Sequence, residues 1–177
     1  MPGIITAEDW QRIDAVHGYM TEHECQWLAS LASVSRSWTE IGVLNGRSAL
    51  AVGLHLSQEA WLQLVDTGFQ PEFWQVREYL RKRRPDLRII VAECTSEIAA
   101  RHLPSTDTVF VDGDHRKDFV ITDLQKWRYK CNDLCGHDYD NPPEHSGVVA
   151  AVDEVLGKVE HPVGAIWWTR RWESGPS

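Results

Sequence analysis

The chain has 177 residues, of which 42% are hydrophobic and 25% charged, and these ordinary globular values exclude a disordered or fibrous chain. Its 18 basic and 26 acidic residues give a net charge of −8, which disfavours a nucleic-acid substrate because an acidic surface repels phosphate backbones. The chain contains no long apolar run, so we expect no membrane contact, and its scattered cysteines favour the reducing cytoplasm.

The first part of the chain has helical patterns. A short helix is expected around residues 7–16. A second begins at Thr21, because Thr21 and Glu24 form a T-x-x-E capping box in which each side chain can satisfy a backbone N–H. Apolar side chains then recur at helical spacing through residues 27–32. We therefore expect two helices before the first strand.

From residue 37 onward, predicted strands and helices alternate. Strands are expected at 37–42, 60–65, 87–91, 108–111, 134–137 and 164–169, with helices at 49–56, 71–84, 96–102, 117–129 and 146–156. Several strands are apolar throughout, which is typical of a parallel sheet covered on both faces by helices. We expect one α/β domain over residues 1–177. Right-handed crossovers would place the carboxyl end of every strand at one edge, where ligands bind.

Glycines and polar side chains follow the first three predicted strands. The first strand leads into an E-x-G-x-x-x-G-x-S sequence made of Glu40, Gly42, Gly46 and Ser48. Its glycines permit positive φ and let a ligand approach the backbone, but it is not the G-x-G-x-x-G dinucleotide fingerprint. Asp66, after the second strand, can accept ribose hydroxyl protons or cap a helix. Ser96, after the third, can cap a helix or face a ligand base.

The fourth and fifth strands end in a cluster of ionisable side chains. Asp112, Asp114 and His115 fall within four residues after a buried strand. Such groups are costly there unless they are solvated, paired or bound to metal, so we favour a functional role. His137 and Asp138 end the next strand and could converge on Asp112. Together they offer oxygen and nitrogen ligands for a divalent cation.

The order of these motifs resembles class I S-adenosyl-L-methionine (SAM)-dependent methyltransferases. It is closest to the small-molecule O-methyltransferases that include macrocin O-methyltransferase, and more distantly resembles catechol O-methyltransferase. The segments that carry the resemblance include WTEIGVLNGRSALAVG, VFVDGDHRKDFVITDLQKW and CGHDYDNPPEHSGVVAAVDEVLG, and the similarity spans about residues 18–172. The resemblance implies a three-layer Rossmann-like fold and a SAM cofactor.

The resemblance also implies a cofactor site, residue by residue. The glycine-rich segment would contact the methionine end of SAM, Asp66 the ribose, and Ser96 the adenine side. The implied cofactor-binding residues are Glu40, Gly42, Gly46, Ser48, Asp66, Ser96 and Asp112.

The residues implied for the chemistry lie after the fourth and fifth strands. Asp112, His137 and Asp138 match the positions where metal-dependent relatives hold Mg²⁺ or another divalent cation. His137 replaces an acidic ligand, which puts magnesium affinity in doubt because magnesium prefers oxygen. His115, or as second choice Asp114, matches the general base.

We therefore expect a SAM-dependent methyltransferase that methylates a hydroxyl group of a small molecule. The sequence is also compatible with assembly into a homo-oligomer. One alternative is a non-catalytic SAM-binding module. Another is an NAD(P)-linked oxidoreductase, against which the absent dinucleotide fingerprint counts. A metal-dependent hydrolase would leave the glycine loop without a role. A zinc site at Cys131, Cys135 and His137 lacks a paired C-x-x-C and a clear fourth ligand.

Overall fold

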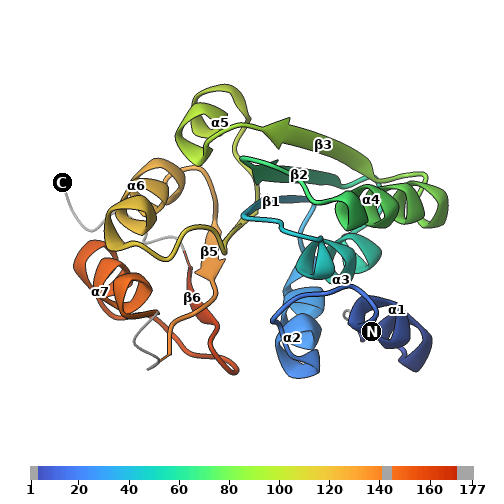
Figure 1. Cartoon of the computed structure of the whole chain (residues 1–177), viewed down its shortest axis with the longest axis horizontal. Coiled ribbons are helices and arrows are strands. Elements are labelled where there is room, and N and C mark those ends of the chain that lie inside the picture. Colours follow the sequence, from blue (N-terminus) through green and yellow to red (C-terminus); the bar gives the residue numbers. More distant parts are fainter. Residues whose placement is uncertain (1–3, 141–144, 171–177) are drawn as a thin grey trace.

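The computed structural model describes residues 4–140 and 145–170 and contains a six-stranded sheet in that part of the chain (Figure 1). The strand order is β3-β2-β1-β4-β5-β6. The first five strands are parallel, and the edge strand β6 runs antiparallel to β5. Their bounds are Ser37–Ile41 for β1, Trp61–Asp66 for β2, Arg88–Glu93 for β3, Thr108–Val111 for β4, Asp133–Gly136 for β5 and Trp167–Arg170 for β6.

Helices cover both faces of the sheet (Figure 1). One apolar core forms between the sheet and the first four helices, and a second forms between the sheet and the last three. The helices are α1 Ala7–Asp14, α2 Glu22–Ala32, α3 Arg47–His55, α4 Pro71–Arg83, α5 Ser96–His102, α6 Lys117–Trp127 and α7 Ser146–Val155. The predicted α/β fold, a mostly parallel sheet with helices on both faces, is confirmed.

The alternation of side chains along the central strands explains the two cores. In β2, Leu62 and Leu64 face the first core, whereas Val65 joins the second. In β4, Phe110 faces the first core, and Val109 faces the second. Because both faces are buried, most positions of these strands are apolar, which gives the apolar runs seen in the sequence.

The edge strand β6 departs from the sequence expectation that all strands end at one edge. It is antiparallel to β5 and pairs Trp167 with Gly136. The residues just before β6, Ala165 among them, therefore lie at the carboxyl edge of the parallel strands. No helix in the described part of the chain is long and apolar enough to cross a membrane.

Local capping fixes where the helices begin. The capping box of α2 is present: the Thr21 Oγ1 accepts from the Glu24 N–H, and the Glu24 carboxylate accepts from the Thr21 N–H at 2.8 Å. Helix α5 is capped by Thr95, whose hydroxyl accepts from the Ile98 N–H. Ser96 is thus the first residue of α5 and does not cap it, and its predicted contact with a ligand base stays a prediction.

Candidate active site

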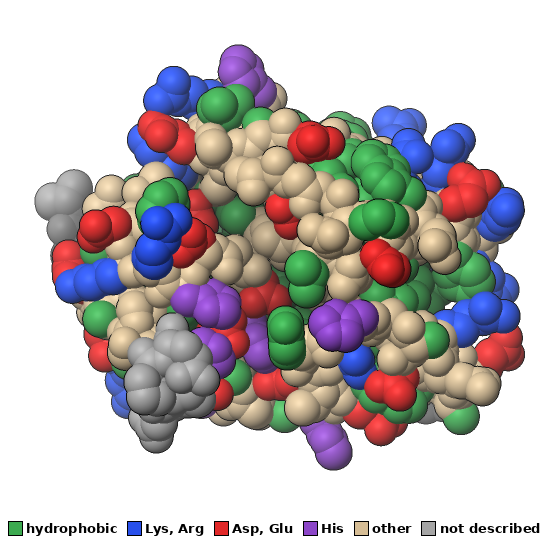
Figure 2. Space-filling view, viewed as in Figure 1, with side chains coloured by type: hydrophobic (Ala, Val, Ile, Leu, Met, Phe, Trp, Pro, Cys, Tyr) green, Lys and Arg blue, Asp and Glu red, His purple; other side chains and the backbone are tan. Residues whose placement is uncertain are grey.

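A cavity of about 1430 Å³ lies at the carboxyl ends of the parallel strands. This exceeds the roughly 300–1,000 Å³ of ordinary ligand pockets, so it has room for a cofactor and a second molecule. Figure 2 shows histidine and acidic side chains gathered in and beside the hollow of this face. All but two of the predicted site residues line the cavity: Gly42, Ser48, Asp66, Ser96, Asp112, Asp114, His115, His137 and Asp138.

The glycine loop after β1 is packed against the end of β4. Gly42 has a φ of +82°, and a Cβ there would lie 2.1 Å from the backbone oxygen of Asp112. Gly46, at a φ of +88°, occupies the N-cap of α3. Glycine is therefore required at position 46 by the turn into α3, and at position 42 by the close approach of the ends of β1 and β4. Gly46 itself does not reach the cavity.

Asp66 holds the glycine loop in place. Its Oδ2 accepts from the N–H groups of Val43 and Leu44 at 2.8 and 3.1 Å, and its Oδ1 accepts from the Gly68 N–H at 3.1 Å. A carboxylate has about four lone-pair sites, so acceptor capacity is left for a ligand. The predicted contact of Asp66 with a ribose stays a prediction.

Glu40 is the second predicted residue outside the cavity and lies directly behind the loop. It is fully buried, and its Oε1 accepts from the Ser48 hydroxyl at 2.7 Å. Its Oε2 has no hydrogen-bond partner among the described residues. Burial raises the pKa of Glu40 to about 8, and the nearby Asp112 and Asp66 act in the same direction. With this pKa the carboxyl group is mostly protonated at neutral pH, so its unpaired Oε2 can donate to an acceptor on a ligand or be ionised by a ligand cation.

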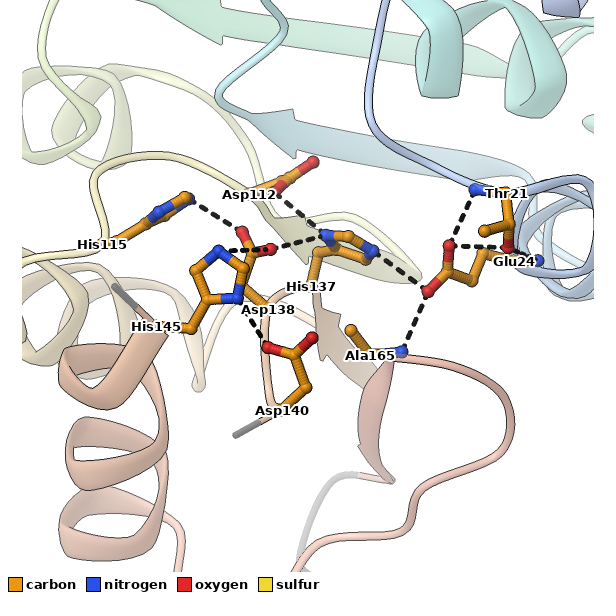
Figure 3. Close-up of polar contacts among 9 residues, drawn as sticks. All are labelled: Thr21, Glu24, Asp112, His115, His137, Asp138, Asp140, His145 and Ala165. Carbon is orange, nitrogen blue, oxygen red and sulfur yellow. Dashed lines mark hydrogen bonds and ion pairs between the residues drawn. The ribbon is translucent and has the colours of Figure 1, made fainter. Parts of the chain in front are cut away.

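His137 is the centre of a polar cluster that joins three parts of the chain (Figure 3). Its Nε2 lies 3.1 Å from the Glu24 Oε1, and its Nδ1 lies 3.0 Å from the Asp138 Oδ1 and 3.9 Å from the Asp112 Oδ1. Burial alone would lower the pKa of His137, but the hydrogen bonds to Asp138 and Glu24 outweigh it and raise this pKa to about 10. The ring is therefore an imidazolium at neutral pH.

Glu24 is fixed by four donors. Its Oε2 accepts from the Thr21 N–H and hydroxyl, and its Oε1 accepts from the Ala165 N–H at 2.9 Å as well as from His137. Burial would raise the pKa of Glu24, but these hydrogen bonds, His137 first, lower it to about 2. The sequence identifies Glu24 only as a capping residue. Its contact with His137 bridges 113 positions and leaves no local signal.

His115 and Asp114 point to different partners. The His115 Nε2 lies 2.8 Å from the Asp138 Oδ2, within the cluster, and the ring is partly exposed at the cavity wall. Asp114 instead forms an exposed ion pair with Arg116 at 2.6 Å, and this hydrogen bond lowers the pKa of Asp114. Of the two predicted bases, only His115 joins the cluster.

Further residues of the cavity carried no sequence signal. The His145 Nε2 lies 3.4 Å from Asp138, and its Nδ1 lies 2.5 Å from the Asp140 Oδ1. The segment of residues 17–20 forms part of the cavity wall. The Asn45 side chain fixes this segment by donating a hydrogen bond to the His17 carbonyl. On the opposite side, the Ser96 hydroxyl oxygen accepts from the Trp127 indole at 2.8 Å.

The sequence pattern of one protein family, described as a methyltransferase domain, matches residues 39–139. The match runs from β1 to just past β5 and spans more than half of the chain. The chain belongs to this methyltransferase family. No curated protein matches the chain.

Solved structures share the fold of this methyltransferase. An O-methyltransferase from Bacillus cereus in complex with SAH has a TM-score of 0.64 at 14% identity, covering 92% of this chain and 89% of that one. The Streptomyces achromogenes O-methyltransferase TomG, involved in tomaymycin synthesis and solved with SAM, has a TM-score of 0.61 at 15% identity, covering 93% and 86%. A methyltransferase from Geobacter sulfurreducens reaches 0.68 at 11% identity, covering 94% and 89%.

The predicted metal ligands of this methyltransferase come together, but their contacts do not fit Mg²⁺. The candidate ligand atoms of Asp112, His137 and Asp138 lie within 4.8 Å of one another. Both ring nitrogens of His137 already face carboxylates, so neither offers a lone pair. The Asp138 oxygens face His137, His115 and His145. Magnesium is usually held by one or two carboxylates and waters, and here one of the two carboxylates is already paired with histidine rings while the His137 ring adds no ligand atom.

Proposed function

We propose that this chain is a SAM-dependent methyltransferase that transfers a methyl group to a hydroxyl group of a small molecule. The observation that carries the proposal is the cavity at the carboxyl edge, bordered by a glycine loop with the unpaired Glu40 Oε2 behind it. The fold is shared with enzymes that were solved with SAM or SAH. SAM would supply the activated methyl carbon and its own leaving group.

The residues in and behind the cavity fit the parts of this cofactor. The unpaired Oε2 of Glu40, which lies behind the glycine loop and outside the cavity, is the candidate hydrogen-bonding group for the methionine end. Asp66, at the end of β2, has acceptor capacity left for a ribose, and Ser96 lies on the wall formed by α5. We extend the proposal to the whole of residues 1–177 as one domain. We also propose that it works in the reducing cytoplasm, in keeping with its four free cysteines.

His115 is the proposed general base. An acceptor hydroxyl must lose its proton as its oxygen attacks the methyl carbon. The His115 Nε2 lies 2.8 Å from the Asp138 Oδ2, so in the proposed neutral form the Nε2 proton faces this carboxylate and Nδ1 accepts the substrate proton. Asp138 has a φ of +62°, a strained backbone for a non-glycine residue of the kind found at functional sites.

Calorimetry with SAH tests the cofactor site. A Cβ at Gly113 would meet no atom closer than 3.8 Å, so Gly113→Val should fold while its side chain narrows the cavity that Gly113 lines. We expect SAH to bind the wild type and to bind Gly113→Val at least about tenfold more weakly. Gly157→Asn, at an open turn away from the cavity, is the control.

The outcomes of this experiment are separable. Equal SAH affinity in folded Gly113→Val would move the cofactor to another place. A wild type that does not bind SAH would refute the proposal. SAH binding without methyl transfer to any hydroxyl acceptor would favour the non-catalytic module instead.

A further inference from the structure

The two ring nitrogens of His137 face two different carboxylates. Nε2 lies 3.1 Å from the Glu24 Oε1 and Nδ1 lies 3.0 Å from the Asp138 Oδ1. Ionised carboxylates only accept hydrogen bonds, so both contacts are favourable at once only when each nitrogen carries a proton. This placement of the ring between two carboxylates, together with its raised pKa, supports a positively charged ring, which is 8% exposed.

Glu24 keeps this charge in one place. Its carboxylate accepts from the backbone N–H groups of Thr21 and Ala165, which belong to the start of α2 and to the turn before β6. Neither donor can leave without moving its element. The other side of the ring faces Asp138 and, at 3.9 Å, Asp112. A fixed positive charge thus lies between the strand ends that carry the two aspartates (Figure 3).

We propose that the imidazolium of His137, held by Glu24, takes the place of a divalent cation in this site and positions the base His115 through Asp138. The base assignment rests on the proposed function, whereas the replacement of the cation does not. His137 and Glu24 are positioning residues in this scheme. The Asp138 Oδ1 lies 3.0 Å from the His137 Nδ1 and its Oδ2 lies 2.8 Å from the His115 Nε2, so the fixed ring sets the orientation of the carboxylate that contacts the base.

The same arrangement acts against a bound metal ion. A cation between Asp112 and Asp138 would lie next to a permanent positive charge, and it would compete with three rings for the Asp138 oxygens. The second candidate group, His115, Asp138 and His145, uses the same carboxylate. We therefore expect catalysis without a metal and no tight ion site at either group.

Nitrogen NMR of histidine-labelled protein tests the charge directly. At about pH 8, well above the ordinary imidazole pKa of about 6.5, His137 should show two protonated ring nitrogens. His137→Gln assigns the signals by removing them. His55, whose Nδ1 lies 2.8 Å from the Ala51 carbonyl oxygen in α3, is the control and should keep its signals in His137→Gln. A His137 ring with a single protonated nitrogen at this pH would overturn the proposal.

Ion titration tests the exclusion of metal. Mn²⁺ and Zn²⁺, followed by calorimetry and for Mn²⁺ by electron paramagnetic resonance, should show no saturable binding to the wild type up to about 1 mM. The double variant Glu24→Gln/His137→Asp removes the imidazolium and adds a carboxylate, so it should gain Mn²⁺ binding. Micromolar binding of either ion to the wild type overturns the proposal, and so does a folded double variant without Mn²⁺ binding. If the double variant does not fold, the wild-type titration decides.

The positioning role has its own readout. Glu24→Gln and His137→Gln should lower kcat by about 10-fold or more while the Kd for SAH is unchanged, and EDTA should leave wild-type kcat unchanged. Parallel loss of kcat and SAH affinity would indicate a merely structural role and would overturn this part. Failure of the wild type to bind SAH would instead defeat the proposed function and leave the NMR and ion results standing.

Discussion

Asp114 and His115 are neighbours in the chain, yet their side chains have opposite surroundings. Asp114 is paired with Arg116 at the surface, and that contact lowers its pKa. A carboxylate stabilised in its charged form is a poor proton acceptor. The His115 Nε2 lies 2.8 Å from the Asp138 Oδ2, an ion-pair contact, and His115 lines the cavity. At the scale of single residues, the structure thus favours His115 as the base.

His115→Ala should lower kcat by about 10²–10⁴-fold because no side chain then removes the proton from the acceptor hydroxyl. The affinity for SAH should stay near that of the wild type, since His115 is proposed to receive the acceptor proton and not to bind the cofactor. Steady-state kinetics with an identified acceptor and calorimetry with SAH measure the two quantities. Asp114→Asn is the matched control and should retain most of the activity. A loss of only a few-fold in His115→Ala would contradict the assignment.

The pair of Glu24 and His137 predicts a pH dependence of stability. The pKa of His137 is raised from 6.5 to about 10 in the folded state, so its contribution is complete below 6.5 and is lost as the pH rises through 10. The pKa of Glu24 is lowered from 4.5 to about 2, so its contribution is present above 4.5 and is lost as the pH falls through 2. Between these windows the pair is fully charged.

We expect the free energy of unfolding to decrease between about pH 6.5 and 10 by up to about 1.4 kcal/mol per pH unit from His137. Urea denaturation across this range measures the slope. In His137→Gln that part of the slope should be absent, whereas the exposed-site variant His102→Gln should keep it. Identical slopes in the wild type and His137→Gln would show that the ring is not held as an imidazolium.

At the scale of elements, helix α2 connects local capping to the active site. Its capping box is a pattern of neighbouring residues, but its Glu24 also reaches β5 through His137 and the start of β6 through Ala165. Because β6 runs antiparallel, the turn before it brings the Ala165 N–H to this carboxylate. A change at the start of α2 should therefore affect both the helix and the cavity.

Thr21→Ala should reduce the free energy of unfolding by about 1 kcal/mol, the usual cost of a lost N-cap. It should also loosen Glu24, which loses the Thr21 hydroxyl at 2.8 Å. Thr6→Ala removes the comparable cap of α1, away from the cluster, and should affect stability alone. Chemical denaturation and the His137 nitrogen signals distinguish the two variants. Equal NMR effects of both changes would contradict this connection.

At the scale of the whole molecule, the charge distribution matches a small-molecule substrate better than a nucleic acid. The net charge of the chain is −8. The four consecutive basic residues 81–84, at the end of α4, have two different roles. Arg81, Lys82 and Arg83 lie exposed at the last turn of α4, whereas Arg84 donates to the backbone carbonyls that end α3 and pairs with Asp86. Most of this run is thus the solvated end of a helix.

Fluorescence anisotropy with a labelled single-stranded RNA should show no saturable binding at micromolar protein and about 0.15 M salt, because binding to phosphate backbones requires cationic surface. Charge reversal of acidic residues near the cavity mouth, such as Asp114→Lys with Glu97→Lys, should raise non-specific binding at low salt. Saturable binding by the wild type at this salt concentration would contradict the small-molecule assignment.

The sequence by itself determined the order of the elements, the α/β fold and the strand ends where the chemistry gathers. Periodicity, capping and turn chemistry are set by neighbouring residues, and the parallel arrangement follows from apolar strands alternating with helices. This is why Asp112, His115, His137 and Asp138 could be expected to meet at one edge before any coordinates were known. Their roles in binding or catalysis stay predictions.

Only the tertiary structure decided how these side chains pair. The direction of β6, the contact of Glu24 with His137 and the bracing of the glycine loop by Asp66 depend on packing between distant segments. The position of Gly42 against the Asp112 backbone has the same origin. A hydrogen bond across more than a hundred residues leaves no periodicity in the chain, because its geometry exists only after both cores have formed.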